Sequence, residues 1–284
     1  MQNVSSNSRL FDETGIPIFR VTGGYPISEA IHDHPDLIPY LRSQNPPRID
    51  NLNREALLHY NYYIAKEKFG LDIEFEPDQA IIPTPMMRYA FLKHILFEGA
   101  KVVEIGTGAS AIIAMLAAKI FKAQVIATEM DPDYLEIAER NIQRNGLESQ
   151  INLIDSKGKF LDGVLSAEER PDFIISNPPY YDIIRSPKLL WGGKTHELVG
   201  DGDVGERFII SMIEEGRQFM KTTGIISFII PKTRQETLVQ IEDYLNQQNY
   251  DFDIFGLKAG NRTRFVFRLY HGVHHKISPD SEMD

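Results

Sequence analysis

The chain has 284 residues, of which 42% are hydrophobic and 25% charged, and both fractions are near the averages for folded proteins. This composition excludes a wholly disordered chain, and the absence of cysteine excludes disulfides, thiolate zinc sites and a cysteine nucleophile. The net charge of -10 excludes a generally basic coat for nucleic acid but leaves room for a local basic groove. No apolar run approaches the ~20 residues that span a bilayer. The polar N-terminus also lacks a signal-peptide core, so we expect a soluble, cytoplasmic protein.

The N-terminal third of the chain contains two kinds of segment. Residues 1–50 have few periodic apolar positions and several Gly and Pro breakers, which predicts an extended arm with one short helix near 35–42. Over 53–69 apolar residues recur at helical spacing, and a second helix is expected at 86–97. We therefore interpret residues 51–98 as an N-terminal helical extension.

Strands alternate with helices after this extension. Strands are predicted at 101–105, 124–128, 151–154, 172–176 and 224–230, and helices at 109–121, 133–144, 206–220 and 234–247. The last two β-prone segments, 252–257 and 264–270, are separated by too few residues for a helical crossover, so they should pair antiparallel. The expected fold class is α/β, with a mostly parallel sheet and one reversed edge strand over 99–272, followed by an acidic tail at 273–284.

A glycine pair marks the turn from the first of these strands into a helix. Gly106 and Gly108 let the backbone approach a ligand, although a lone G-x-G is a weak signal and a plain β–α turn is the alternative. Glu129 ends the next strand 21 residues after Gly108, where a carboxylate can accept hydrogen bonds from both hydroxyls of a ribose. Alone, Glu129 also fits a helix N-terminal acid. Together the two features favour an adenosine-containing cofactor.

The fourth strand ends in the sequence Asn177-Pro178-Pro179-Tyr180. The Asn177 side-chain oxygen and the Pro178 carbonyl can both accept protons from a planar NH₂ group, which aligns its nitrogen toward a methyl donor without a strong base. Tyr180 can stack on the ring that carries the amine, and a cationic sulfonium is favoured beside an aromatic face. The alternative is a polar turn that contains a proline pair. The sequence shows no Ser–His–Asp ordering and no His-rich cluster, so no metal is expected.

These motifs together resemble the class I S-adenosyl-L-methionine-dependent methyltransferases that act on amines. Within that class the chain is similar to the RlmF-like adenine-N6 methyltransferases of ribosomal RNA and their small-nuclear-RNA relatives. The similarity runs roughly over residues 34–270 and includes Pro83-Thr84 with Arg88, Gly106 to Ser110, and Gly260 to Phe265. The resemblance implies a seven-stranded, mostly parallel sheet whose last strand is antiparallel, preceded by a helical extension.

The resemblance also implies roles for individual residues. Arg88 would hold the methionine carboxylate of S-adenosyl-L-methionine, Glu129 its ribose hydroxyls and Asp155 its adenine. Asn177 would contact both the cofactor and the target amine. The family usually has phenylalanine where this chain has Tyr180, a form also seen in glutamine-N5 methyltransferases. The other cofactor contacts that the resemblance implies are Glu104, Gly106, Thr107, Gly108 and Ser110.

Basic residues are concentrated near the C-terminus. Residues 255–276 contain five Lys or Arg and no acid, whereas residues 1–100 hold 9 basic against 13 acidic side chains. With the long glycine-rich loop 181–205, this stretch would form a partly aromatic rim for RNA, and the loop would be a lid over the target base. The alternative is a hairpin with solvated charges. The candidate substrate-binding residues are Tyr180, Tyr181, Lys188, Trp191, Lys194, Arg262 and Arg264.

The sequence therefore predicts an S-adenosyl-L-methionine-dependent N-methyltransferase acting on the N6 amine of an adenine in RNA. Ribosomal RNA is the favoured substrate, and a monomer without metal or membrane partners is the favoured state. Within the enzyme class, the alternatives are methylation of a small-molecule amine or of a protein glutamine side chain. Outside it, the alternative is a binding module without turnover. The intact motif at Asn177 disfavours that module, which would have no chemical need for it.

Overall fold

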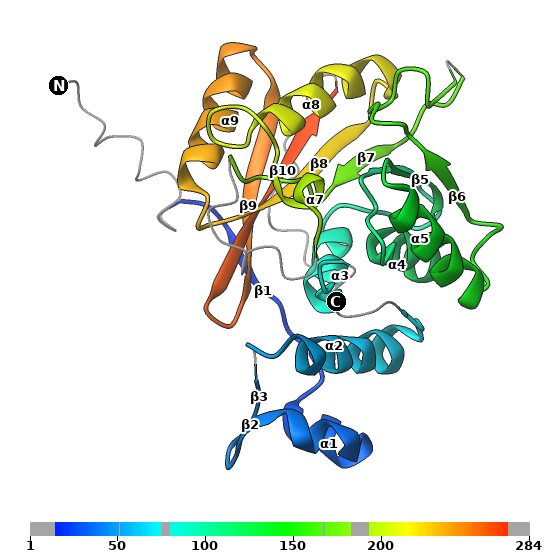
Figure 1. Cartoon of the computed structure of the whole chain (residues 1–284). Coiled ribbons are helices and arrows are strands. Elements are labelled where there is room, and N and C mark those ends of the chain that lie inside the picture. The colour runs from blue at the N-terminus through cyan, green and yellow to red at the C-terminus, as the bar shows by residue number, and fades with distance from the viewer. Residues whose placement is uncertain (1–14, 51, 75–79, 167, 183–192, 272–284) are drawn as a thin grey trace.

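An eight-stranded β-sheet forms the centre of the protein (Figure 1). The structure, a computed structural model, describes residues 15–50, 52–74, 80–166, 168–182 and 193–271. The sheet has the strand order β1-β9-β10-β8-β7-β4-β5-β6. Its strands are β1 (Ile18–Arg20), β4 (Lys101–Ile105), β5 (Gln124–Glu129), β6 (Ile151–Asp155), β7 (Phe173–Ser176), β8 (Ile225–Pro231), β9 (Asp251–Ala259) and β10 (Arg262–Tyr270).

The sheet is parallel except at its last strand. β4 to β8 pair in parallel with one another, and β10 is antiparallel to both β8 and β9, which confirms the predicted α/β class with its mostly parallel sheet. The sheet has eight strands, not the expected seven, because β1 adds a strand beside β9. The expectation that the reversed strand lies at an edge is wrong. β10 lies between β8 and β9, in register from Arg264 opposite Pro231 to Tyr270 opposite Ile225. Residues 265–267 are fully buried, so β10 is apolar on both faces and suits an inner position, while β1 pairs with β9 on its other side.

Helices cover both faces of the sheet (Figure 1). The helices are α2 (Arg54–Phe69), α3 (Pro85–Lys93), α4 (Ile112–Phe121), α5 (Pro132–Arg144), α7 (Thr195–Leu198), α8 (Arg207–Phe219) and α9 (Gln235–Gln247). α3, α4 and α5 contribute to one hydrophobic core, and α8 and α9 contribute to the other. Residues 112–118 of α4 are all buried, as expected for a helix that is apolar all round. No helix in the described part of the chain is long and apolar enough to cross a membrane.

The described part of the N-terminal segment, from residue 15 to residue 50, is not the extended arm that the sequence predicts. β1 joins the sheet and is followed by α1 (Ile27–Asp33), the 3-10 helix η2 (Pro35–Tyr40) and a hairpin of β2 (Leu41–Gln44) and β3 (Pro47–Ile49). η2 occupies the position of the short helix that was expected. Ala30, Leu37 and Ile49 are buried in the same core as α2. Each of these elements has at most seven residues, which is too short for a periodic apolar pattern to reveal it.

The start of α4 is set by the loop before it. The sequence predicts a helix from residue 109, but α4 begins at Ile112 because Ala111 adopts a left-handed conformation with φ +47°. The segment from Gly106 to Ala111 therefore remains a loop at the carboxyl end of β4. α3 likewise ends at Lys93 instead of continuing to residue 97.

Candidate active site

A cavity of about 340 Å³ lies at the carboxyl ends of β4, β5 and β7. The chain order of the sheet reverses between β4 and β7, and open α/β sheets bind ligands outside the strand ends at such a point. The structure brings nine of the residues indicated by the sequence into the cavity wall: Arg88, Glu104, Gly106, Thr107, Gly108, Ser110, Glu129, Asn177 and Pro179.

The loop after β4 presents its backbone to the cavity. Gly106 and Gly108 have φ values of +72° and +68°, a region that favours glycine. A Cβ added to Gly106 would meet nothing within 4 Å, so the space beside this residue is open. The Gly108 N–H donates to Glu129 Oε2 at 2.9 Å. The loop therefore combines open space with a fixed carboxylate.

Glu129, at the end of β5, is held by backbone groups. Gly108 donates to Oε2, while the N–H groups of Met130 and Asp131 donate to Oε1 at 2.7 and 3.0 Å. The residue is only 5% exposed. A carboxylate has about four lone-pair sites, so after these three bonds it can still accept from a ligand. Its orientation in the cavity wall is therefore fixed before a ligand arrives.

Glu104, in β4, is a second buried carboxyl group in the cavity wall. It is 1% exposed, and the Thr107 hydroxyl donates to its Oε2 at 2.8 Å. Burial raises the pKa of Glu104 to about 7, although the hydrogen bond from Thr107 acts in the opposite direction. The ionisation state of a carboxyl group with a pKa near neutrality changes readily when a charged ligand binds beside it.

Arg88, in α3, places a buried positive charge in the cavity wall. The residue is 8% exposed, and its Nη1 has no hydrogen-bond partner among the described residues. Burial, together with the smaller effect of the nearby Arg264 charge, lowers the pKa of Arg88 to about 9. Burying a charge without a partner is unfavourable. An anionic ligand group would supply the missing partner.

Asn177 follows β7 and is also incompletely bonded. Its Oδ1 is buried, and no described group donates to it. The backbone beyond it is well anchored, because the N–H groups of Tyr180 and Tyr181 both donate to the Leu198 carbonyl at 3.0 and 2.9 Å. Arg234 Nε donates to the Tyr180 carbonyl at 3.1 Å. A buried acceptor left without a donor costs roughly 1–3 kcal/mol, which indicates a position prepared for a ligand.

Two glycines pack against the backbone of residues 177–181, the candidate catalytic loop. A Cβ on Gly200 would lie 2.6 Å from the Pro179 carbonyl oxygen, and one on Gly205 would lie 2.6 Å from the carbonyl carbon and oxygen of Tyr180. Real Cβ atoms do not approach backbone this closely. The glycine-rich composition of the segment after the motif is therefore required by the close contact of two backbone segments.

Gly205→Ala is expected to destabilise the protein by roughly 2–5 kcal/mol, because it combines backbone strain at φ +84° with overpacking against Tyr180. Gly99→Ala is the matched control, since Gly99 has φ +78° but nothing within 4 Å of its Cβ position. Urea unfolding of both variants measures the difference. Equal losses of unfolding free energy would show that the contact with Tyr180 adds nothing.

The structure adds Glu197 and Tyr134 to the cavity wall, and the sequence indicates neither as a site residue. Glu197 Oε2 accepts hydrogen bonds from the Tyr134 hydroxyl at 2.7 Å and the Ile81 N–H at 3.3 Å. Burial raises the pKa of Glu197 to about 7. The one available signal is that Glu197 is the single acid between residues 183 and 200.

Some residues of the predicted site do not line this cavity. Asp155 is exposed, and its carboxylate accepts the Lys157 N–H at 2.9 Å, whereas the neighbouring Ser156 lines the cavity. Asp155 is thus next to the cavity wall in sequence without belonging to it, and its contact with the cofactor stays a prediction. Pro178 and Tyr180 also lie outside the cavity wall, although the other two residues of their motif belong to it.

Lys194 is not placed as the sequence predicts for a residue that binds RNA. Its Nζ lies 2.6 Å from Asp131 Oδ1 and 2.7 Å from Asp133 Oδ2. These carboxylates neutralise its charge, and the contact attaches the segment before α7 to the start of α5. Lys194 therefore anchors α7 in this structure.

The remaining candidates for substrate binding have different surroundings. Arg262 is exposed at the start of β10, whereas Arg264 is half-buried, with an Nη1 that is buried and has no partner in the described chain. The guanidinium of Arg234 lies 4.9 Å from the ring centroid of the half-buried Tyr181. Lys188 and Trp191 fall outside the described residues, as does the part from 183 to 192 of the lid predicted at 181–205.

A family model, a curated relative and a solved structure to which this chain is similar are all methyltransferases. The model of an RNA methyltransferase family matches residues 17–186. A putative methyltransferase of Methanocaldococcus jannaschii is 36% identical over 262 residues, which cover 88% of this chain and 99% of that protein. The crystal structure of a methyltransferase from Pyrococcus furiosus is 34% identical, with a TM-score of 0.65 over 78% of this chain and 99% of that chain.

More distant proteins share the fold or parts of the sequence. The U6 small nuclear RNA (adenine-(43)-N(6))-methyltransferase of Schizosaccharomyces pombe is 28% identical over 79% of this chain and 63% of that protein. The N-terminal domain of human METTL16, solved in complex with SAH, is 21% identical with a TM-score of 0.71, over 87% of this chain and 95% of that chain. The family model spans more than half of the chain, and the archaeal relative aligns over nearly its whole length. The chain therefore belongs to the RNA methyltransferase family.

Proposed function

We propose that this protein transfers a methyl group from S-adenosyl-L-methionine to the N6 amine of an adenine in RNA, with ribosomal RNA as the substrate class. The proposal rests on Asn177, whose side-chain oxygen is buried at the end of β7 without a donor among the described residues. Such an acceptor suits a planar amine, and adenine carries one on a flat ring. The fission yeast relative, named for adenine-N6 methylation of a small nuclear RNA, supports this target atom.

The cofactor is S-adenosyl-L-methionine, which when bound supplies an electrophilic methyl group on a sulfonium sulfur. The cavity residues fit this cofactor. The buried guanidinium of Arg88 suits the methionine carboxylate, and the fixed carboxylate of Glu129 suits the ribose hydroxyls. The open space beside Gly106 allows a ligand to approach the backbone closely.

In the mechanism we propose, the protein positions the target and supplies no base. Asn177 Oδ1 and the Pro178 carbonyl accept the two hydrogens of the amine, which holds the nitrogen lone pair toward the methyl donor. Tyr180 stacks on the target ring and excludes water. Transfer breaks the methyl–sulfur bond as the methyl–nitrogen bond forms. The nitrogen then carries one proton too many, which it releases to bulk water as the product leaves the site. An adenine in a duplex must first be flipped out of the stack, whereas a loop adenine needs less unstacking.

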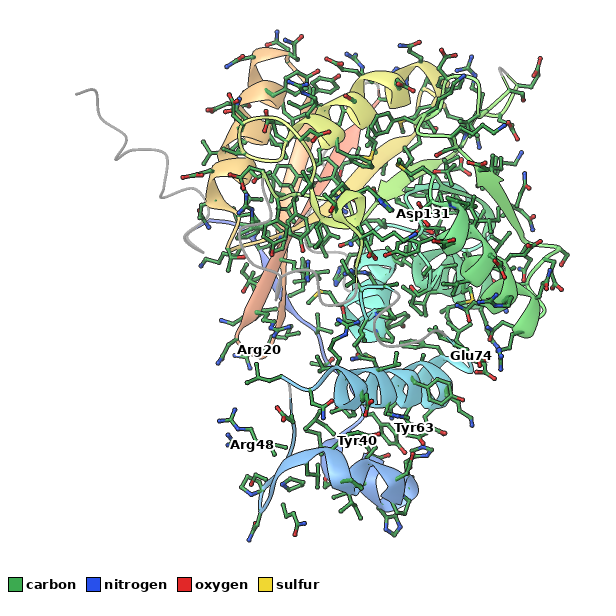
Figure 2. All side chains as sticks on the ribbon, in the orientation of Figure 1. Arg20, Tyr40, Arg48, Tyr63, Glu74 and Asp131 are labelled. Carbon is green, nitrogen blue, oxygen red and sulfur yellow. The ribbon has the colours of Figure 1, made fainter. Side chains whose placement is uncertain are left out.

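Exposed arginines in the N-terminal segment and in the hairpin of β9 and β10 support an RNA substrate. β1 places Arg20 next to Lys258 of β9, and Arg262 follows at the start of β10. Arg20, Arg48 and Arg262 are exposed, and Figure 2 shows Arg20 and Arg48 along the same edge of the molecule. Basic side chains of this kind bind phosphates regardless of base sequence. The basic rim would therefore combine β1 and β3 with the C-terminal hairpin.

Mass spectrometry of RNA nucleosides from cells with and without the gene tests the proposed target. We expect N6-methyladenosine to disappear from one site in ribosomal RNA when the gene is deleted. An unchanged level at every site would contradict the proposal. Loss of a methylated glutamine in protein, or of a methylated amine among the metabolites, would then identify the true substrate.

Cofactor affinity is expected to fall as the pH falls from 8 to 6. Burial raises the pKa of both Glu104 and Glu197 to about 7, so both carboxyl groups become protonated in the free protein over this range. The cofactor is cationic at its sulfonium and ammonium groups and favours the ionised carboxylates, so binding at low pH must release protons. Isothermal titration calorimetry should show a Kd that rises by up to about tenfold per pH unit for each coupled carboxyl group. A Kd independent of pH would contradict this coupling.

A further inference from the structure

Glu197 places a carboxylate beside Gly108, in the loop that follows β4. It comes from a segment that lies after the Asn177–Tyr180 motif in the chain. It lies in α7 and lines the cavity. Its Oε1 is 3.8 Å from the position that a Cβ on Gly108 would occupy, so one carboxylate oxygen lies directly against the loop. The other oxygen, Oε2, is held by Tyr134 and Ile81. The carboxylate is therefore fixed on one side and faces the open loop on the other.

The surroundings of Glu197 indicate which ligand group it meets. Gly108 also donates its N–H to Glu129, so two carboxylates lie beside the same glycine. Arg88 is close enough for the charge of Glu197 to stabilise its guanidinium. Glu197 therefore lies near both the residue that we assign to the ribose and the residue that we assign to the methionine carboxylate. Between the ribose and the carboxylate, the cofactor carries two cationic groups, the sulfonium and the α-ammonium.

The charge of Glu197 has no direct counter-ion in the described part of the protein. Its carboxylate takes part in no salt bridge there, although it is mostly buried and its pKa is raised by burial. Buried charges are stable only when they are paired and hydrogen-bonded. A positively charged ligand group would supply the missing pair.

We propose that Glu197 binds the α-ammonium group of S-adenosyl-L-methionine and thereby connects cofactor binding to the catalytic loop. The connection runs through the next residue, because the Leu198 carbonyl accepts the N–H groups of both Tyr180 and Tyr181. A ligand that fixes Glu197 therefore also fixes the backbone that carries the residues for the target base. Glu197 binds the cofactor and is a positioning residue for the target amine. This inference rests on the cofactor orientation proposed above and is independent of the RNA target.

The variant Glu197→Gln, tested with two ligands, separates a direct contact from a structural role. Glutamine keeps the size of the side chain and an acceptor for Tyr134. S-adenosyl-L-homocysteine carries the α-ammonium group, whereas 5′-methylthioadenosine lacks the whole amino-acid portion. By calorimetry, we expect the Kd for S-adenosyl-L-homocysteine to rise roughly 10- to 100-fold, the usual effect of losing a charge-assisted hydrogen bond. The Kd for 5′-methylthioadenosine should not change, and equal losses for both ligands would overturn the proposal.

Lys194→Gln is the matched control for the position of α7. It removes the ion pairs with Asp131 and Asp133, and Lys194 does not line the cavity. We expect it to affect the two ligands equally. A selective loss of S-adenosyl-L-homocysteine binding in this variant would show that the position of α7 produces the selectivity, and the proposal would then be overturned.

Amide hydrogen exchange tests the connection to the catalytic loop. In the wild-type protein, S-adenosyl-L-homocysteine should protect the amides of Tyr180 and Tyr181 more strongly than 5′-methylthioadenosine does, and Glu197→Gln should abolish this difference. Equal protection by both ligands in the wild-type protein would contradict the connection. Neither experiment contains RNA, so failure here is distinguishable from failure of the adenine assignment.

Discussion

Replacing Asn177 with alanine is expected to lower the rate of methyl transfer by about 10²- to 10³-fold or more, as when an enzyme loses a preorganised hydrogen-bond group at its reacting centre. The variant removes the buried Oδ1 that we assign to the target amine. Arg88 and Glu129, which we assign to the cofactor, remain unchanged. The Kd for S-adenosyl-L-homocysteine should therefore stay within about tenfold of the wild-type value, since one neutral hydrogen bond contributes ~0.5–1.5 kcal/mol.

Single-turnover assays and calorimetry together separate these two effects. Asn152→Ala provides a control, because Asn152 is exposed on β6 and does not line the cavity. That variant should transfer methyl groups at the wild-type rate. Turnover retained by Asn177→Ala at a comparable rate would show that another group positions the amine, and the assignment of this motif would fail.

Replacing Arg88 with methionine is expected to weaken cofactor binding by roughly 10²- to 10⁴-fold, which corresponds to the ~3–5 kcal/mol cost of breaking a buried ion pair. The guanidinium is buried with an Nη1 that no described residue satisfies, and its pKa is lowered to about 9 by burial. The free protein should lose little stability, because the substitution removes a charge that is poorly compensated without ligand. Thermal unfolding without cofactor measures this second effect.

Decarboxylated S-adenosylmethionine identifies the group that Arg88 binds. This ligand keeps the ammonium and the sulfonium but lacks the carboxylate. Arg88→Met should therefore weaken S-adenosyl-L-methionine binding much more than binding of the decarboxylated form, whereas Glu197→Gln should weaken both. An Arg88→Met variant that loses the two ligands equally would refute the carboxylate assignment.

The sheet and its helices were predictable because their signals are local. β4 starts and ends where the apolar run at 101–105 predicts, and α5, predicted at 133–144, begins one residue earlier. The position of β10 was not predictable from the same pattern, because pairing with β8 depends on contacts between residues far apart in the sequence. The short elements before residue 50 carry too few residues for any periodic signal.

Some residues of the candidate site could be predicted from local sequence patterns, and others could not. Gly106, Glu129 and Asn177 end or directly follow β4, β5 and β7, which are neighbours in the sheet, so their parallel pairing brings the three residues to one edge. Glu197 reaches the same cavity from an irregular segment whose path depends on contacts with Tyr134 and Ile81. A count of basic residues in the sequence does not show which of them are paired with carboxylates. Lys194 counts as basic in the sequence, but the structure pairs it with two aspartates.

Methyl transfer to RNA by the purified protein provides a direct test of the proposed activity. Purified protein is incubated with S-adenosyl-L-methionine carrying a deuterated methyl group and with ribosomal RNA from cells that lack the gene, and the RNA is then digested to nucleosides for mass spectrometry. We expect deuterated N6-methyladenosine with the wild-type protein and none with Asn177→Ala. Label on a different nucleoside, or no label in RNA with the active wild-type protein, would contradict it.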